Sequence, residues 1–115
     1  MIVAISISPS GSPVVPDDGA DPADTADTAD GGVSAVVAEA VRAIRASGLP
    51  CETNAMFTNI EGDWDEVMTA VKRAVDVVAE RYPRVGLVLK ADIRPGYDGQ
   101  LTAKVQRVEE HLRER

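Results

Sequence analysis

The residues best suited to bind a small polar molecule lie between positions 54 and 61. Asn54 offers an amide, Thr58 a hydroxyl and Glu61 a carboxylate, and all three groups can form directional hydrogen bonds. Glu61 can accept hydrogen bonds from an amino-heterocycle or pair with a cation, but it can equally be a strand-end acid near the positive end of the following helix. Asn54 and Thr58 can either satisfy the backbone of a turn or point into a cleft. The sequence leaves these alternatives open.

The segment after Glu61 has the pattern of a helix start. Asp63 can accept hydrogen bonds from the free N–H groups of a first helical turn, and Glu66, three residues later, fits the returning half of a capping box. Glu61 is not needed for this cap. It is therefore a spare carboxylate between a strand and a helix.

Other polar residues give weaker signals. Asp92 and Arg94 stand at the rim of a predicted strand, where they can pair with each other or line the same cleft. His111, among charged neighbours on a terminal helix, is interpreted as a surface residue. Cys51 is interpreted as a small packing residue because no basic partner is evident. The chain has no GxxxxGK[ST], GxGxxG, HExxH, CxxC or GxSxG motif, so we expect no catalytic residues, no metal site and no cofactor.

Hydrophobic periodicity predicts the elements that position these residues. Apolar residues alternate in strands and recur every three or four residues in helices. The predicted elements, in chain order, are a strand over 2–8 stopped at Pro9, a helix over 33–46, hairpin strands over 50–54 and 57–61, a helix from the Asp63 cap to about Arg81, a strand over 84–94 and a helix over 101–112. This order predicts an α+β fold, a ferredoxin-like β-α-β-β-α-β sandwich with an extra C-terminal helix.

Two surfaces of this predicted fold need a covering. The predicted helices cover only one face of the sheet. The other face must therefore be polar, bound to a ligand or buried against another subunit. The C-terminal helix carries a narrow apolar stripe, which can dock on a neighbouring subunit as well as on its own sheet. The stripe consists of Leu101, Val105, Val108 and Leu112.

Length and charge limit the possible partners. The 115 residues are enough for a single domain over 1–115, with an acidic insertion at about 16–32 that we expect to be disordered. The net charge of −7 resides mainly there, since six of the 19 acidic residues lie in 17–32 and the remainder nearly balances at 13 acidic against 12 basic. No basic footprint for nucleic acid or membrane is present, and no apolar run is long enough to span a bilayer. With one cysteine and no signal-peptide pattern, we expect a cytoplasmic protein.

Several stretches resemble a known family in order and spacing: MIVAISISPSG, SGLPCETNAMFTNIEGDWDEVMTAVKRA, RVGLVLKADIR and LTAKVQRVEEHL. They are similar to the small thiamine-binding proteins of the MTH1187/YkoF-like group, formerly a family of uncharacterised proteins. The most specific piece is the T-x-IEGD-x-DEV block from Thr58 to Val67, preceded by Asn54 and Met56.

This resemblance implies a ferredoxin-like fold, homo-oligomers that are dimers or tetramers, and binding of thiamine or its hydroxymethylpyrimidine moiety without catalysis, as a carrier or sensor. An apolar wall from Met56, Phe57 or Ile60 would cover the ligand's rings. The alternative is a structural or regulatory homo-oligomer that acts through protein contacts and whose ligand site is vestigial. The ligand-binding positions that the resemblance implies are Asn54, Thr58 and Glu61, with Ser6, Ser8, Asp92 and Arg94 as weaker candidates.

Overall fold

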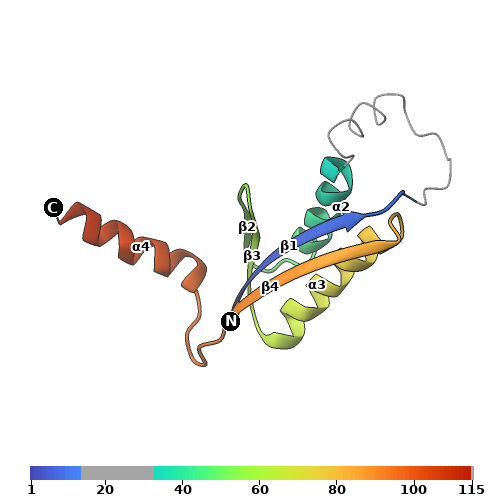
Figure 1. The fold of residues 1–115 in the computed structure, drawn as a ribbon. Helices are drawn as coiled ribbons and strands as arrows, with labels where there is room; N and C mark the ends of the chain where they lie inside the picture. The colour runs from blue at the N-terminus through green and yellow to red at the C-terminus, as the bar shows by residue number, and fades with distance from the viewer. Residues whose placement is uncertain (14–32, 115) are drawn as a thin grey trace.

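The computed structural model describes residues 1–13 and 33–114. Four strands and three helices follow one another in the order β-α-β-β-α-β-α (Figure 1). The elements are β1 (Ile2–Ser10), α2 (Val33–Arg45), β2 (Cys51–Thr53), β3 (Thr58–Glu61), α3 (Trp64–Ala79), β4 (Arg84–Asp92) and α4 (Gln100–Arg113). The predicted α+β class and element order are confirmed, whereas the expected acidic insertion lies outside the described residues.

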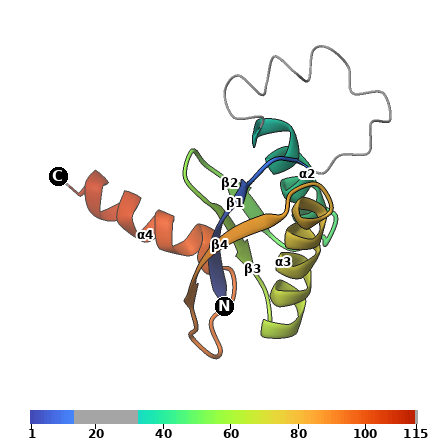
Figure 2. The same ribbon diagram turned by 45° about the vertical axis from the view of Figure 1, so that its right-hand side comes forward.

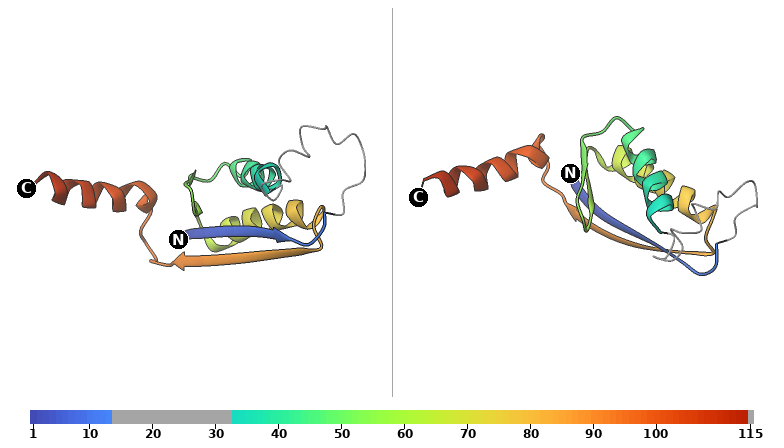
Figure 3. Two further views of the ribbon diagram at one scale, coloured as in Figure 1. Left: turned by 45° about the horizontal axis from the view of Figure 1, so that its top comes forward. Right: turned by 90° about the horizontal axis from the view of Figure 1, so that it is seen from above.

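The strands form one antiparallel sheet in the order β2-β3-β1-β4. The helices α2 and α3 lie side by side on one face of this sheet, and α4 extends away from both layers (Figures 2 and 3). β1 is therefore a central strand, with β3 on one side and β4 on the other. Residues of β1, β3 and β4 that are far apart in sequence meet around it.

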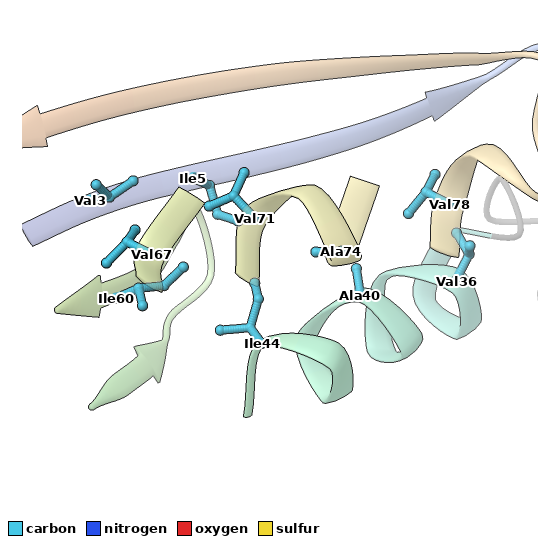
Figure 4. Packing of buried hydrophobic residues seen from close by; sticks show 10 residues of the cluster. All are labelled: Val3, Ile5, Val36, Ala40, Ile44, Ile60, Val67, Val71, Ala74 and Val78. Carbon is cyan, nitrogen blue, oxygen red and sulfur yellow. The ribbon is translucent and has the colours of Figure 1, made fainter. Parts of the chain in front are cut away.

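The core lies between the sheet and the two packed helices (Figure 4). Val3, Ile5 and Ile60 of the sheet face Val67 and Val71 of α3, and α2 closes the other side. All these side chains are almost fully buried. The predicted wall residue Ile60 therefore belongs to the core rather than to a ligand site. Small β-branched and aliphatic side chains fill this narrow space, as the scarcity of aromatic residues requires.

The two neighbours of β1 differ in length. β3 pairs with it only from Ile2↔Glu61 to Ile5↔Thr58, but β4 pairs with it from Ile2↔Asp92 to Ser10↔Arg84. The second half of β1 thus has a paired edge towards β4 and, among the described residues, no strand on its β3 side. This difference in length forms the hollow described below.

The first strand corrects the sequence prediction. Pro9 was expected to end the strand at Ser8, but β1 continues to Ser10 with Pro9 opposite Val85. Proline is tolerated in a strand where its missing N–H would face an unpaired side. The last strand is shorter than expected, since β4 ends at Asp92 and Arg94 lies in the loop that follows.

The C-terminal helix is anchored only at its start. None of its residues is buried, and Val105, Val108 and Leu112 are 55%, 59% and 65% exposed. Figure 1 shows α4 projecting from the end of β4. The apolar stripe predicted on this helix therefore does not pack on its own sheet.

Candidate functional site

The predicted ligand-binding residues separate into two groups at the two ends of β3. Thr58 and Glu61, three residues apart, lie about 10 Å from each other along the strand at a rise of roughly 3.3 Å per residue. We call the first site the hairpin hollow and the second the α4 socket. The hairpin hollow is lined by Ile5, Ser6, Ile7, Val37 and residues 53–58, and the α4 socket by Met1, Ile2, Glu61, Asp92, Arg94, Tyr97, Gln100 and Lys104.

In the α4 socket, Glu61 caps the C-terminal helix. The backbone N–H of Gln100 donates to Glu61 Oε2 at 2.8 Å, and that of Leu101 donates to Oε1 at 3.1 Å. The residue at the N-cap position, Gly99, has no side chain and a left-handed φ of +67°, so the carboxylate comes from elsewhere in the chain. Glu61 is only 7% exposed. It thus stabilises the start of α4, a role that neither of the alternatives left open by the sequence included.

The turn after Glu61 fixes the direction of this carboxylate. Gly62 packs closely, because a Cβ there would approach side-chain carbons of Leu49 and Val67 to 3.2 Å. Asp63 and Glu66 form the predicted capping box of α3, with the Asp63 N–H donating to Glu66 Oε1 at 3.4 Å. The block from Thr58 to Val67 therefore acts as a scaffold between strand and helix.

Asp92 and Arg94 also serve α4 and its preceding loop. Asp92 pairs with Lys104, whose hydrogen bond and positive charge lower the pKa of this carboxyl below its ordinary 3.8. The guanidinium of Arg94 stacks over the Tyr97 ring, 3.6 Å from its centroid. The two side chains line the same socket, as the sequence allowed, but each has a closer partner than the other.

The hairpin hollow lies beside the unpaired half of β1 and opens to solvent, with a volume of about 210 Å³. Asn54 Oδ1 accepts hydrogen bonds from the N–H groups of Met56 and Phe57, both at 2.9 Å, and so holds the turn. Thr58 is 8% exposed, and its hydroxyl lies 3.0 Å from that of Thr53. Ser6 also lines the hollow, but it belongs to the other face of β1, because Ile5 shares its face with Thr58.

Apolar side chains complete the hollow. The expected wall residues Met56 and Phe57 line it, joined by Ile5, Ile7 and Val37. A much smaller apolar hollow of about 30 Å³ adjoins it and shares Ile5, Ile7, Val37 and Thr58. Because the second hollow is otherwise lined only by α2 side chains, the site has a polar mouth and an apolar interior.

Some residues fall outside the expected groups. Ser8 is exposed and lines neither site. Sequence reasoning missed Thr53 and Ile7 in the hollow, and Tyr97 and Lys104 in the socket. Their spacing gave no signal, since only the sheet register and the path of the loop after β4 bring them to these sites.

Two further properties concern the described residues as a whole. In residues 1–13 and 33–114, no group of three or more His, Cys, Asp or Glu side chains is arranged to hold a metal ion. Within the same part of the chain, no helix is both long and apolar enough to cross a membrane. Cys51 is half-buried against the core, and His111 is exposed with its Nδ1 3.8 Å from Glu114.

We predict that Glu61→Gln loosens α4 without unfolding the core. The amide keeps one acceptor oxygen but replaces the other with a donor, which leaves an N–H of the first α4 turn unpaired. Loss of a cap typically costs about 1 kcal/mol, which corresponds to a roughly fivefold faster amide exchange at Gln100 and Leu101. Hydrogen exchange measured by NMR tests this, with Glu52→Gln on exposed β2 as the matched control. Unchanged exchange at both amides in Glu61→Gln would contradict the assignment.

A second prediction concerns the Asp92–Lys104 pair. Because the folded pKa of Asp92 is depressed, the contribution of this pair is present above pH 3.8 and is lost as the pH falls through the lower folded pKa. A ¹³C NMR titration should place the Asp92 midpoint below 3.8, and Lys104→Met should raise it. Lys72→Met, which removes a lysine paired with Asp76 within α3, is the control and should leave the midpoint unchanged. An equal midpoint in all three proteins would refute the pairing.

Comparisons with known proteins place the chain in a family. The family model for thiamine-binding proteins matches residues 23–109. The UPF0045 protein Mb1933 of Mycobacterium bovis is 58% identical over 67 residues, which cover 57% of this chain and 66% of that protein. The UPF0045 protein MJ1052 of Methanocaldococcus jannaschii is 39% identical over 62 residues, covering 54% of this chain and 62% of that protein. The chain thus matches somewhat less than two thirds of the length of these relatives.

Solved structures share the fold. The crystal structure of MJ1052 from M. jannaschii superposes with a TM-score of 0.70 at 28% identity, covering 95% of both chains. A Thermotoga maritima protein, whose description proposes a role in thiamine biosynthesis or salvage, superposes with a TM-score of 0.61 at 23% identity, covering 94% of this chain and 99% of that one. The match of the family model to most of the chain, carried on this fold, shows that the protein belongs to the thiamine-binding protein family.

Proposed function

We propose that this protein binds thiamine or a thiamine-related pyrimidine such as hydroxymethylpyrimidine in the hairpin hollow, as a carrier or sensor without catalysis. The observation that carries the proposal is the meeting of Ser6, Asn54 and Thr58 around one hollow with an apolar interior. These residues come from β1 and from both ends of the hairpin turn. Family membership supplies the ligand class.

The chemistry of the hollow suits such a ligand. An aminopyrimidine presents a ring nitrogen that accepts and an exocyclic amine that donates, and hydroxyl groups can pair with either. The hydroxyls of Thr53 and Thr58 form one hydrogen bond with each other. This bond fixes the directions in which the remaining donor and the remaining lone pairs can bind a ligand. Phe57 and Met56 provide apolar surface for the ring faces.

The residue types at this site support the proposal of a binding role without catalysis. The described side chains that line the hollow are hydroxyls, one amide and apolar groups, and none of them titrates near neutral pH. Such groups orient a ligand but do not transfer protons. The half-buried thiol of Cys51, the single cysteine, suits a reducing cytoplasm.

The proposal predicts a thermal shift with thiamine, thiamine phosphates or hydroxymethylpyrimidine. A ligand at about 100 times its dissociation constant stabilises the fold by roughly 2.7 kcal/mol. Ser6→Ala should weaken binding about fivefold, the usual effect of one lost hydrogen bond. Ser8→Ala is the matched control, since it makes the same change two residues further along the same face of β1 and lies outside the hollow.

Two results would contradict this assignment. If none of these compounds raises the melting temperature, the ligand is not thiamine or a thiamine-related pyrimidine. Binding that Glu61→Gln abolishes and Ser6→Ala leaves intact would place the ligand in the α4 socket, where Glu61, Asp92 and Arg94 remain candidate contacts.

A second candidate function is a homo-oligomer that acts through protein contacts. The exposure of Val105, Val108 and Leu112 favours it, because a helix held only near its N-terminal end gains stability by burying its apolar stripe. We propose that this stripe docks on a second copy of the chain to form a dimer or tetramer. One protein can both bind a ligand and form this oligomer. If the ligand site is vestigial, assembly through protein contacts is the function that remains.

Val108→Asp is predicted to dissociate this oligomer at micromolar concentration, because docking would bury the new charge. Gln106→Asp makes a similar addition of charge on the opposite side of α4 and should leave the oligomer intact. Light scattering coupled to size-exclusion chromatography measures both. A monomeric wild-type protein, or an oligomer that survives Val108→Asp, would contradict docking through α4.

A further inference from the structure

The half of β1 beyond Ile5 presents main-chain groups to the hairpin hollow. The hydrogen bonds around β3 establish which ones. The Glu61 N–H donates to the Pro50 carbonyl and the Asn54 N–H to the Phe57 carbonyl, both at 2.9 Å, so the odd-numbered residues of this hairpin arm turn their main-chain groups towards β2. The Gly62 N–H donates to the Met1 carbonyl at 3.1 Å. Even-numbered residues of this arm therefore turn their main-chain N–H and C=O groups towards β1.

The register extends this alternation onto β1. Met1, Val3 and Ile5 direct their N–H and C=O groups towards β3, opposite Gly62, Ile60 and Thr58. The next residue in this row is Ile7. β3 begins at Thr58, however, so Ile7 has no strand partner on this side within the described part of the chain, and it lines the hairpin hollow.

The row ends immediately after Ile7. Pro9 occupies the next position and has no N–H to donate. An added peptide strand needs a series of donors and acceptors, and this edge offers one complete pair. The edge therefore suits a single small group with one donor beside one acceptor better than it suits a peptide.

We propose that the main chain of Ile7 recognises the ligand's heterocycle. A ring nitrogen accepts a hydrogen bond from the Ile7 N–H, and the exocyclic amine next to it donates to the Ile7 C=O. Thr53 and Thr58, whose hydroxyls lie 3.0 Å apart, line the same hollow as Ile7. This inference rests on the proposed function and defines the ligand class more narrowly, as a planar ring with an amine adjacent to an unprotonated ring nitrogen.

The neighbouring apolar hollow adds a second criterion. Ala40, Val41 and Ile44 of α2 line it behind Ile7 and Thr58. A small alkyl substituent on the ring would fit this interior, where a charged substituent would lose its hydration. We therefore place the charged or polar end of the ligand at the mouth, beside Ser6 and Asn54.

The test compares hydroxymethylpyrimidine with the same molecule carrying an oxo group in place of the amine. The oxo form reverses the donor and acceptor pattern, so we expect it to bind at least about tenfold more weakly. ¹⁵N–¹H NMR of the wild-type protein provides the direct readout. The Ile7 amide proton should move downfield and exchange more slowly with the amino compound, while the Ser8 amide, which faces β4, should change little.

Each alternative has its own result. If both compounds bind equally and the Ile7 amide is unaffected, main-chain recognition is wrong and the proposed function stands. If neither compound, nor thiamine, binds, both are wrong. If the Ile7 amide is protected without ligand in proportion to protein concentration, the edge pairs with a second copy of the chain, and recognition of a heterocycle by Ile7 is overturned.

Discussion

The unequal pairing of β1 with its two neighbours is the constraint on which the candidate site depends. β4 pairs with β1 along its whole length, so β1 continues as a strand beyond the point where β3 stops. The hairpin turn, held by Asn54, begins at that point, and a hollow lies where the β1–β3 ladder would otherwise continue. A β3 strand two residues longer would fill the hollow and satisfy Ile7. The site thus arises because β3 is shorter than β1 and leaves part of β1 without a neighbour on that side.

The short strand β3 has a different role at each end. At Thr58 it supplies a hydroxyl to the hollow, and at Glu61 it supplies the cap that attaches α4. Buried Ile60 lies between them and fixes the strand to the core. The most specific block of the sequence therefore couples ligand contacts and the C-terminal helix through one rigid segment. If α4 mediates assembly, binding and assembly share this segment, although the structure requires no movement between them.

The sequence predicted what depends on local patterns. Apolar periodicity located the helices and strands, and the Asp63–Glu66 spacing located the start of α3. It did not predict the partner of Glu61, because the Gln100 and Leu101 amides come from a helix 39 and 40 residues later in the chain. The continuation of β1 through Pro9 was also missed. That continuation depends on which side of the strand lacks a neighbour, a property of sheet order that no single segment encodes.

The central claim is that the ligand lies beside the unpaired half of β1. A crystal structure of the full-length protein with thiamine or hydroxymethylpyrimidine tests it most directly. The account predicts electron density for the pyrimidine between Ile7 and the 53–58 turn, with the ring nitrogen and amine within hydrogen-bond distance of the Ile7 main chain. Density for the pyrimidine against Glu61 in the α4 socket, with Gln100 and Leu101 displaced from the carboxylate, would contradict it.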